Sequence, residues 1–245
     1  MRLAVPACGL PALADRLQLL RRLARRRHLS PATRRTAHTQ VRIAAGHDPQ
    51  PTAAVIDSHS VRAADTVPKT TRGWDNAKKV NGRKRHIAVD TTGLVLDVVI
   101  TAASVQDRQG ARPLLWNTHR ACRGVRLIWA DAGYTGTLRT WATAMKMTLQ
   151  ILSRRNPHAF EVLPRRWVVE RTFAWISKHR RTVRDYERLP GHHETIVYWA
   201  MTITMTRRLA RRPAAQLTAG HCPGRLLYPT RDIAIRAHRG SVVPA

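Results

Sequence analysis

Two short hydrophobic segments of this 245-residue chain each lead directly into an aspartate. Residues 125–130 (VRLIWA) are mostly apolar and precede Asp131, which is followed by a glycine-containing turn. Residues 53–56 (AAVI) precede Asp57 in the same way. Short apolar runs bounded by turn residues predict buried β-strands. A carboxylate at the end of such a strand can face an open cleft, although an aspartate there also commonly accepts hydrogen bonds from turn amides.

The remaining hydrophobic pattern predicts alternating strands and helices. Residues 87–101 form a predicted hairpin around the turn at 91–93, and 149–152 form a short strand. Helices are expected at about 104–120, 138–147, 164–184 and 194–212, and Pro213 ends the last of them. This order of elements indicates an α/β domain.

Two further acidic residues belong to predicted helices. Ser104 to Asp107 resembles a capping box, so Asp107 is interpreted as a helix cap, with a place at the edge of a cleft as the alternative. Glu170 lies beside the apolar stripe of the helix that Pro164 opens, and small residues follow it on its own side. We expect this carboxylate to face a cleft between the helix and the sheet.

Three regions are expected along the chain. Residues 1–40 form an atypical basic segment, with a leucine-bearing amphipathic helix followed by an arginine cluster. Residues 41–212 form the main α/β domain, and residues 213–245 form a loose tail without hydrophobic periodicity.

The chain is strongly basic, with 43 Lys+Arg against 15 Asp+Glu and a formal charge of +28. So much positive charge opposes compaction and favours a polyanionic partner, of which nucleic acid is the usual one. A hydrophobic content of 43% is too high for a disordered basic tail. The three widely spaced cysteines indicate no zinc site or disulfide framework, and no apolar run approaches a membrane span. We therefore expect a cytoplasmic, nucleoid-associated protein.

Residues 69–86 carry most of the candidate nucleic-acid contacts. Glycines make this segment loop-like, and a tryptophan lies among its cations. Cations can bind phosphates while an aromatic ring stacks on a base, although a solvated charged loop is the alternative. The candidate DNA-binding residues here are Trp74, Lys78, Lys79, Arg83, Lys84 and Arg85.

Asp57, Asp131 and Glu170 call for an explanation in a chain with so few acids. An unpaired carboxylate in an apolar segment is costly, so each needs either an arginine or a cation. Magnesium prefers oxygen ligands, and two such ions can stabilise the attacking and leaving oxygens of a phosphoryl transfer. The sequence thus allows a carboxylate metal site within a basic, DNA-attracting surface.

The chain resembles the DDE transposases of bacterial insertion sequences, in the insertion-sequence-five-type branch. The resemblance spans about residues 41–212 and rests on the segments IDSHSVRAA (56–64), GWDNAKKVNGRKRHIAVDTTGLVL (73–96), ASVQDRQGA (103–111), WADAGYTG (129–136) and LPRRWVVERTFAWISKHRRTVRDYERLP (163–190).

This resemblance implies a ribonuclease H-like fold, with a mixed five-stranded sheet and flanking helices. By position it implies that Asp57, Asp131 and Glu170 are the catalytic, metal-binding triad. It also implies magnesium-dependent cleavage of double-stranded DNA at terminal inverted repeats, with manganese able to substitute. A new 3′-hydroxyl would then attack target DNA, and the protein would act as a homo-oligomer on paired ends.

The helix around Glu170 offers further DNA contacts. Related transposases often carry a Tyr-x-x-Arg-x-x-x-Glu run followed by a lysine. Here Arg166 lies four residues before Glu170 and Lys178 eight after it, but Leu163 replaces the tyrosine. Arg166, Arg171 and Lys178 are therefore included among the candidate DNA-binding residues.

Both ends of the chain depart from the family pattern. Family members usually carry a longer helical DNA-binding region before the catalytic domain, so we expect a truncated or rearranged copy with an intact catalytic core and impaired recognition of DNA ends. The alternative functions are a non-catalytic DNA-binding protein, such as a decayed transposase or repressor, an RNA-binding basic protein, and a nuclease without strand transfer. The three carboxylates argue against complete decay, and the RNA-binding alternative gives no reason for them.

Overall fold

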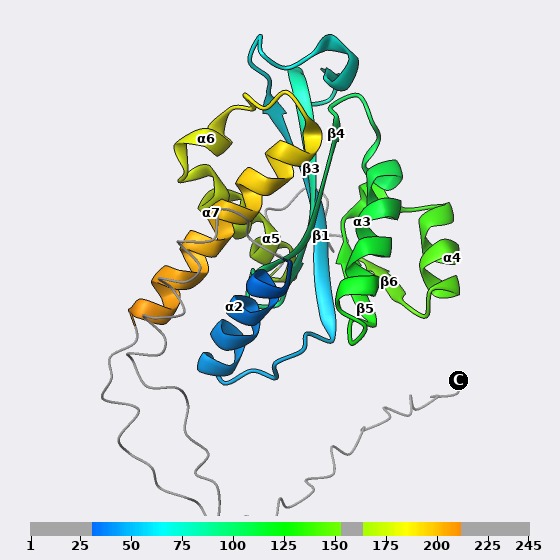
Figure 1. Cartoon of the computed structure of the whole chain (residues 1–245). Helices are drawn as coiled ribbons and strands as arrows, with labels where there is room; N and C mark the ends of the chain where they lie inside the picture. Colours follow the sequence, from blue (N-terminus) through cyan, green and yellow to red (C-terminus); the bar gives the residue numbers. More distant parts are fainter. Residues whose placement is uncertain (1–30, 153–163, 212–245) are drawn as a thin grey trace, which may run out of the picture. The chain divides into compact units, whose positions relative to one another are not determined.

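A computed structural model describes residues 31–152 and 164–211 of the chain (Figure 1). The expectations for residues 1–30, for the tail at 213–245 and for Leu163 lie outside the described residues. Everything below concerns the domain formed by the described segments.

A mixed sheet forms the centre of the domain. β1 (Ala53–Arg62) pairs antiparallel with β3 (Val80–Asp90), and β3 pairs antiparallel with β4 (Val95–Ala102). β5 (Leu127–Ala130) pairs parallel with β1 and β6 (Thr148–Ile151) pairs parallel with β5, so the order is β4-β3-β1-β5-β6. A short strand, β2 (Gly73–Asp75), also pairs with the start of β3. The predicted five-stranded mixed sheet is therefore present, with this one additional short strand among the described residues.

Helices cover both faces of the sheet (Figure 1). α3 (Asp107–Ala121) and α4 (Thr137–Ala144) lie on one face. The other face carries α2 (Pro31–Ala44), α5 (Pro164–Ser177), α6 (Arg180–Val183) and α7 (Pro190–Ala210). Because strand side chains alternate, neighbouring residues of β1 join different cores. Val55 packs with α5 and α7, and Ile56 packs with α3.

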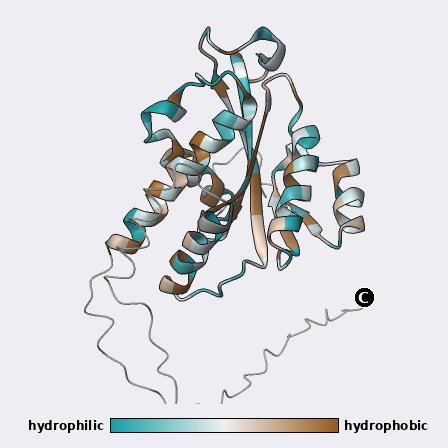
Figure 2. Ribbon diagram, in the orientation of Figure 1, coloured by the Kyte–Doolittle hydropathy of each residue, from teal (hydrophilic) through white to brown (hydrophobic). Residues whose placement is uncertain are grey.

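The hydrophobic pattern of the chain follows these layers. Figure 2 shows hydrophobic residues along the strands and hydrophilic residues on the loop that precedes β3. The predicted stripe of α5 is correct, because Val169, Phe173 and Ile176 are all buried against the sheet. Burial of these side chains holds α5 on the face to which Asp57 points.

The hairpin turn forms as predicted. Gly93 has a φ of 83°, a left-handed conformation that glycine adopts without steric cost. The structure corrects the view of residues 69–86 as a loop, because β3 begins at Val80 and its residues 82–90 are all buried. β1 likewise continues beyond Asp57 to Arg62, so this aspartate lies within a strand.

α2 crosses the boundary expected between residues 40 and 41. It packs against α7, and Arg42 and His38 both contact the buried carboxylate of Asp90. The Arg42 Nη1 atom is 2.6 Å from Asp90 Oδ2. A buried carboxylate needs such partners, so this ion pair joins the end of β3 to α2. Residues 31–44 therefore pack as part of the sheet domain.

The long helix expected at 164–184 is divided into α5 and α6. Chain reversal after Ser177 brings Asp185 to β1, where its backbone pairs with Ala63. The Asp185 carboxylate is fully buried and contacts Arg83 Nη1 at 3.0 Å and His193 Nδ1 at 2.7 Å. This network requires the helix to end early, because a continuous helix would carry Asp185 away from the sheet.

Candidate active site

Asp57 and Asp131 extend from two adjacent central strands. Ala54 pairs with Ile128 and Val55 with Trp129 in parallel register. Continuing this register by two residues places Asp57 opposite Asp131, at the point where β5 ends and β1 continues. The sequence predicted two acidic strand ends, and the parallel pairing brings them to the same place.

The backbone after β5 fixes the Asp131 side chain. Asp131 caps the short 3₁₀ turn at Ala132–Tyr134, and its Oδ1 atom accepts a hydrogen bond from Gly133 N at 2.9 Å. This is the turn bond considered above as the alternative to a catalytic role. It uses one oxygen, while Oδ2 lies 3.8 Å from the Arg166 guanidinium. One carboxylate can therefore both cap the turn and face the cleft.

Glu170 approaches the same region from α5. Arg166 lies one helical turn earlier, and its Nε atom is 3.1 Å from Glu170 Oε1. The same guanidinium contacts Asp131, so Arg166 links the second and third carboxylates of the expected triad. The side chains of Glu170 and Arg166 are 46% and 37% exposed, which leaves this side of the cluster open to solvent.

Asp57 is the most deeply placed of the three carboxylates. Burial, and then the nearby negative charge of Asp131, raise the pKa of Asp57 to about 6. Hydrogen bonding from Ser58 N at 2.7 Å and the positive charges of Arg166 and Lys78 act in the opposite direction. Destabilisation of the ionised form is the behaviour expected of a buried group that a cation would stabilise.

A second polar cluster, which the sequence did not reveal as part of the site, lies on the opposite face of β1. Asp107 Oδ1 accepts a hydrogen bond from Ser58 Oγ at 2.7 Å and lies 2.9 Å from Lys84 Nζ. The interpretation of Asp107 as a helix cap is wrong, because Gln106 and Gln109 form the capping box. The alternative considered above for Asp107, a place at the edge of a cleft, was the sequence signal for this second cluster, and Asp107 does line a pocket.

Tyr134 is buried beneath both clusters. Burial, followed by the charges of Asp57, Asp107 and Asp131, raises the pKa of the Tyr134 phenol well above its ordinary value. The phenol therefore stays neutral, and it places an uncharged polar group next to three carboxylates.

The carboxylates suit a hard divalent cation in their chemistry, because all donate oxygen. Among the described residues, no three His, Cys, Asp or Glu side chains are close enough together to hold one metal ion. The observed counter-charge is Arg166, which contacts Asp131 and Glu170 directly. Its positive charge also opposes the rise in the pKa of Asp57. The oxygen donors thus suit a cation in their chemistry, and in the observed arrangement the Arg166 guanidinium takes that place.

Several of the expected DNA-binding residues are accessible. Trp74 is 52% exposed, and Lys78, Lys79 and Lys178 lie at the surface. Lys78 Nζ donates to Ser58 O at 3.1 Å, next to Asp57. Arg171 is half-buried beside the Trp175 ring and lies within hydrogen-bonding distance of Thr92 O.

The structure corrects the prediction for three residues of β3. Arg83 and Arg85 are fully buried, Arg83 in the Asp185 network and Arg85 against His193 and Thr182. Lys84 points to the opposite face and is also buried, beside Asp75 and Asp107. Sequence could not distinguish these cations from surface ones, because their partners are distant along the chain. All three stabilise the domain and are not available at the surface for DNA.

No helix in the described segments is both long enough and apolar enough to cross a membrane.

The fold and the site together define an α/β domain of the ribonuclease H-like class, in which Arg166 joins a carboxylate at the end of one central strand to a carboxylate on a flanking helix, beside a third carboxylate on the neighbouring strand. The chain matches the transposase DDE domain family over residues 48–205, and it belongs to that family. It is also 31% identical over 191 residues to the putative transposase for insertion sequence element IS402 of Burkholderia cepacia. This match covers 73% of this chain and 87% of the relative. The predicted transposase function is thus confirmed at the level of the family.

Solved structures similar to the chain include integrases and a transposase. The catalytic core domain of BIV integrase has a TM-score of 0.41 at 13% identity, covering 61% of this chain and 80% of the integrase chain. A chain of the simian T-cell lymphotropic virus intasome has a TM-score of 0.42 at 15% identity, and the match covers 61% of this chain and 48% of the intasome chain. A chain of the Mos1 strand transfer complex has a TM-score of 0.30 at 13% identity, and the match covers 86% of this chain and 64% of the Mos1 chain.

Membership of this family makes the chain a DNA-cleaving and DNA-transferring enzyme, of a family that generally works with a divalent metal ion.

Proposed function

We propose that this transposase cleaves DNA at the terminal inverted repeats of an insertion sequence and joins the released 3′-hydroxyl to target DNA. The observation that supports the proposal is the arrangement of Asp57, Asp131 and Glu170 around Arg166. The first two extend from strands in parallel register, and the third shares the Arg166 guanidinium with Asp131. A network of structural ion pairs does not require carboxylates from three separate elements at one open cleft.

The proposed cofactor is Mg²⁺, for which Mn²⁺ substitutes, held by Asp57, Asp131 and Glu170. When bound, the metal would stabilise negative charge on the attacking and leaving oxygens of the phosphodiester. Asp57 would bind it in the ionised form, since a cation offsets both its burial and the repulsion from Asp131. Arg166 would then be released from the carboxylates and could hold a DNA phosphate.

The proposed DNA surface surrounds the cleft. It includes residues from the β2–β3 turn and from the helix that carries Glu170, and it excludes the buried cations of β3. Its members are Trp74, Lys78, Lys79, Arg166, Arg171 and Lys178. Joining two element ends to one target requires more than one active site, so we also propose that the protein acts as a homo-oligomer on paired DNA ends.

A strand-cleavage assay tests this function. The full chain is mixed with labelled duplex DNA taken from either side of its own gene, in the presence of Mg²⁺ or Mn²⁺. We expect metal-dependent cleavage at a fixed position, and joined products when target DNA is added. Asp57→Asn, Asp131→Asn and Glu170→Gln should each abolish cleavage and leave DNA binding nearly intact, because removing a negative charge does not weaken attraction to phosphate.

The outcomes separate the remaining functions. Cleavage without joined products would identify a nuclease of this fold. Binding without cleavage would favour a decayed transposase or a repressor. Substantial cleavage by any one of the three variants would remove that residue from the catalytic assignment.

A further inference from the structure

Trp74 lies between two pockets of contrasting chemistry. It belongs to β2, where it pairs with Asn81 on β3, and its side chain is more than half exposed. The first pocket has a volume of about 530 Å³ and the second about 380 Å³, and Trp74 lines both. An indole in this position offers a flat apolar surface to any planar group that enters.

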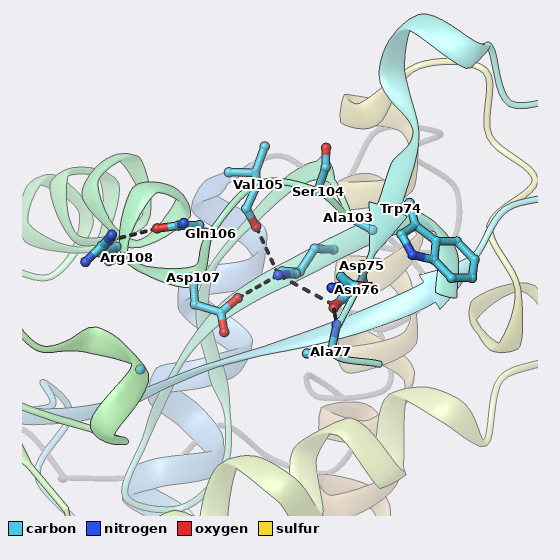
Figure 3. Close-up of a pocket in the computed structure, with 12 residues that line it drawn as sticks. Trp74, Asp75, Asn76, Ala77, Ala103, Ser104, Val105, Gln106, Asp107 and Arg108 are labelled. Atoms are coloured by element: carbon cyan, nitrogen blue, oxygen red, sulfur yellow. Dashed lines mark hydrogen bonds and ion pairs between the residues drawn. The ribbon is translucent and has the colours of Figure 1, made fainter. Parts of the chain in front are cut away.

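The first pocket extends from Trp74 towards the 3₁₀ turn that follows Asp131. Trp74 and Asn76 lie at one end, and Gln106 and Arg108 at the other (Figure 3). Gly133, two residues after Asp131, also lines it. A group that enters this pocket therefore comes close to the candidate active site.

The charges that line the first pocket balance one another. Asp75 and Asp107 share the buried ammonium of Lys84, whose Nζ atom is 3.6 Å from Asp75 Oδ2 and 2.9 Å from Asp107 Oδ1. Lys84 Nζ also donates to Val105 O at 2.9 Å. Arg108 also lines the pocket, so its two carboxylates are balanced by two cations and a phosphate gains no net attraction there. A neutral planar group with hydrogen-bonding edges suits the pocket, since its polar lining also includes Asn76, Ser104 and Gln106.

The second pocket carries a net positive charge. Arg62, Arg72 and Lys79 line it against a single carboxylate, that of Asp65. Asp65 is fully exposed and lies 4.0 Å from Arg72, so solvent screens most of its charge. Three cations around an open pocket of this size fit a phosphate.

We propose that Trp74 separates the two halves of a binding site for one unpaired nucleotide of a DNA strand. The base occupies the first pocket, here named the base pocket, and stacks on Trp74. The adjoining phosphate occupies the second, here named the phosphate pocket. The inference rests on the proposed function for its substrate, and it adds that a nucleotide beside the cleavage position leaves the base-paired duplex.

Two oligomers with the same phosphates test the base pocket. A short oligothymidine and an abasic oligomer of equal length are titrated against the full chain without divalent metal, and binding is followed by fluorescence anisotropy. The wild-type protein should prefer the oligothymidine by about tenfold, the scale of one stacked base. Trp74→Ala should lose this preference and bind both oligomers equally, and Trp74→Phe should retain part of it.

Trp116→Ala is the matched control, because Trp116 is similarly exposed at 51% and lines neither pocket. It should leave the preference unchanged. Arg62→Gln tests the phosphate pocket and should weaken binding of both oligomers by a similar factor, whereas Arg139→Gln, at an exposed position on α4, should weaken both less. Retention of the full preference by Trp74→Ala, or loss of preference in Trp116→Ala, would overturn the proposal.

The test also separates this inference from the proposed function. A Trp74-dependent preference in a protein that never cleaves its flanking DNA would support the nucleotide site and count against the transposition reaction. Cleavage by a protein whose Trp74→Ala variant keeps the preference would overturn only the nucleotide site.

Discussion

Arg166 contacts Glu170 across one turn of α5, with Nε 3.1 Å from the carboxylate Oε1 atom. The same guanidinium lies 3.8 Å from Asp131 Oδ2. One cation therefore compensates two carboxylates that approach the cleft from different elements. A metal ion that binds both of them must displace this arginine.

Replacing Arg166 should strengthen metal binding. We expect Arg166→Gln to raise the affinity for Mn²⁺ by roughly twofold to fivefold, the scale of partly exposed ion pairs, while DNA cleavage falls because a phosphate contact is lost. Mn²⁺ binding is measured by electron paramagnetic resonance on the free protein. Arg165→Gln serves as the control, because Arg165 stacks on Trp129 and contacts no carboxylate of the site. An unchanged or lower Mn²⁺ affinity in Arg166→Gln would contradict the displacement.

Metal binding should weaken in acid because of Asp57. Its pKa is raised to about 6 by burial and by Asp131, so the carboxylate takes up a proton as the pH falls through about 6. Below that pH the Mn²⁺ affinity should fall about tenfold per pH unit, since proton and metal compete for one group. Titrations across this range measure the effect. Asp57→Asn should bind Mn²⁺ weakly at every pH and lack this step, and a step of the same size in that variant would assign it to another residue.

The same shift predicts that Asp57 destabilises the fold at neutral pH. The pKa of Asp57 is raised from its ordinary value of 3.8 to about 6. The contribution of this residue to the stability of the folded state is therefore complete below pH 3.8 and is lost as the pH rises through about 6. Asp57→Asn removes the buried charge and keeps an acceptor for Ser58 N. Its Tm at pH 8 should rise on the order of 5 °C, measured by calorimetry without metal. The gain should vanish at about pH 4, and a Tm below wild type at pH 8 would contradict the burial cost.

Loss of the Asp185 carboxylate should destabilise the domain strongly. Asp185 is fully buried between Arg83 and His193. Asp185→Asn leaves Arg83 charged and unpaired in the interior, which costs about 3–5 kcal/mol in the free energy of unfolding. Urea denaturation measures this change. Asp65→Asn is the control, because the Asp65 side chain is fully exposed and its loss should leave the free energy of unfolding essentially unchanged.

DNA binding should distinguish surface cations from buried ones. Lys79→Gln should leave stability unchanged and reduce the slope of log K against log salt concentration by about one, as expected for one lost phosphate contact. Arg83→Gln should instead lower the Tm and leave the salt slope of the folded protein unchanged, since Arg83 is fully buried. Affinities measured by anisotropy over a range of salt concentrations decide between them. A reduced salt slope in folded Arg83→Gln would restore the original prediction.

Local patterns in the sequence were sufficient for the elements and for the identity of the candidate carboxylates. Short apolar runs bounded by turn residues predicted the strands that carry Asp57 and Asp131, and helical spacing predicted the buried stripe beside Glu170. These signals depend on neighbouring residues, so one sequence suffices to read them. Net charge and the family resemblance then indicated DNA as the substrate, and the family assignment agrees.

Tertiary structure decided which charged groups meet. Arg83 and Asp185 are 102 residues apart in the chain, and Ser58 and Asp107 are 49 apart. Cations at 83, 84 and 85 looked alike in sequence, yet all three are buried. The return of the chain after α6 covers Arg83 and Arg85, whereas Lys84 lies on the opposite face beside Asp75 and Asp107. Trp74 could be identified as a possible stacking residue, but the pockets beside it depend on the fold. The first exists because β2 and β3 meet the start of α3, and the second because they meet the end of β1. Charge and hydropathy belong to single residues, whereas burial, pKa and pocket chemistry depend on the groups that folding brings together.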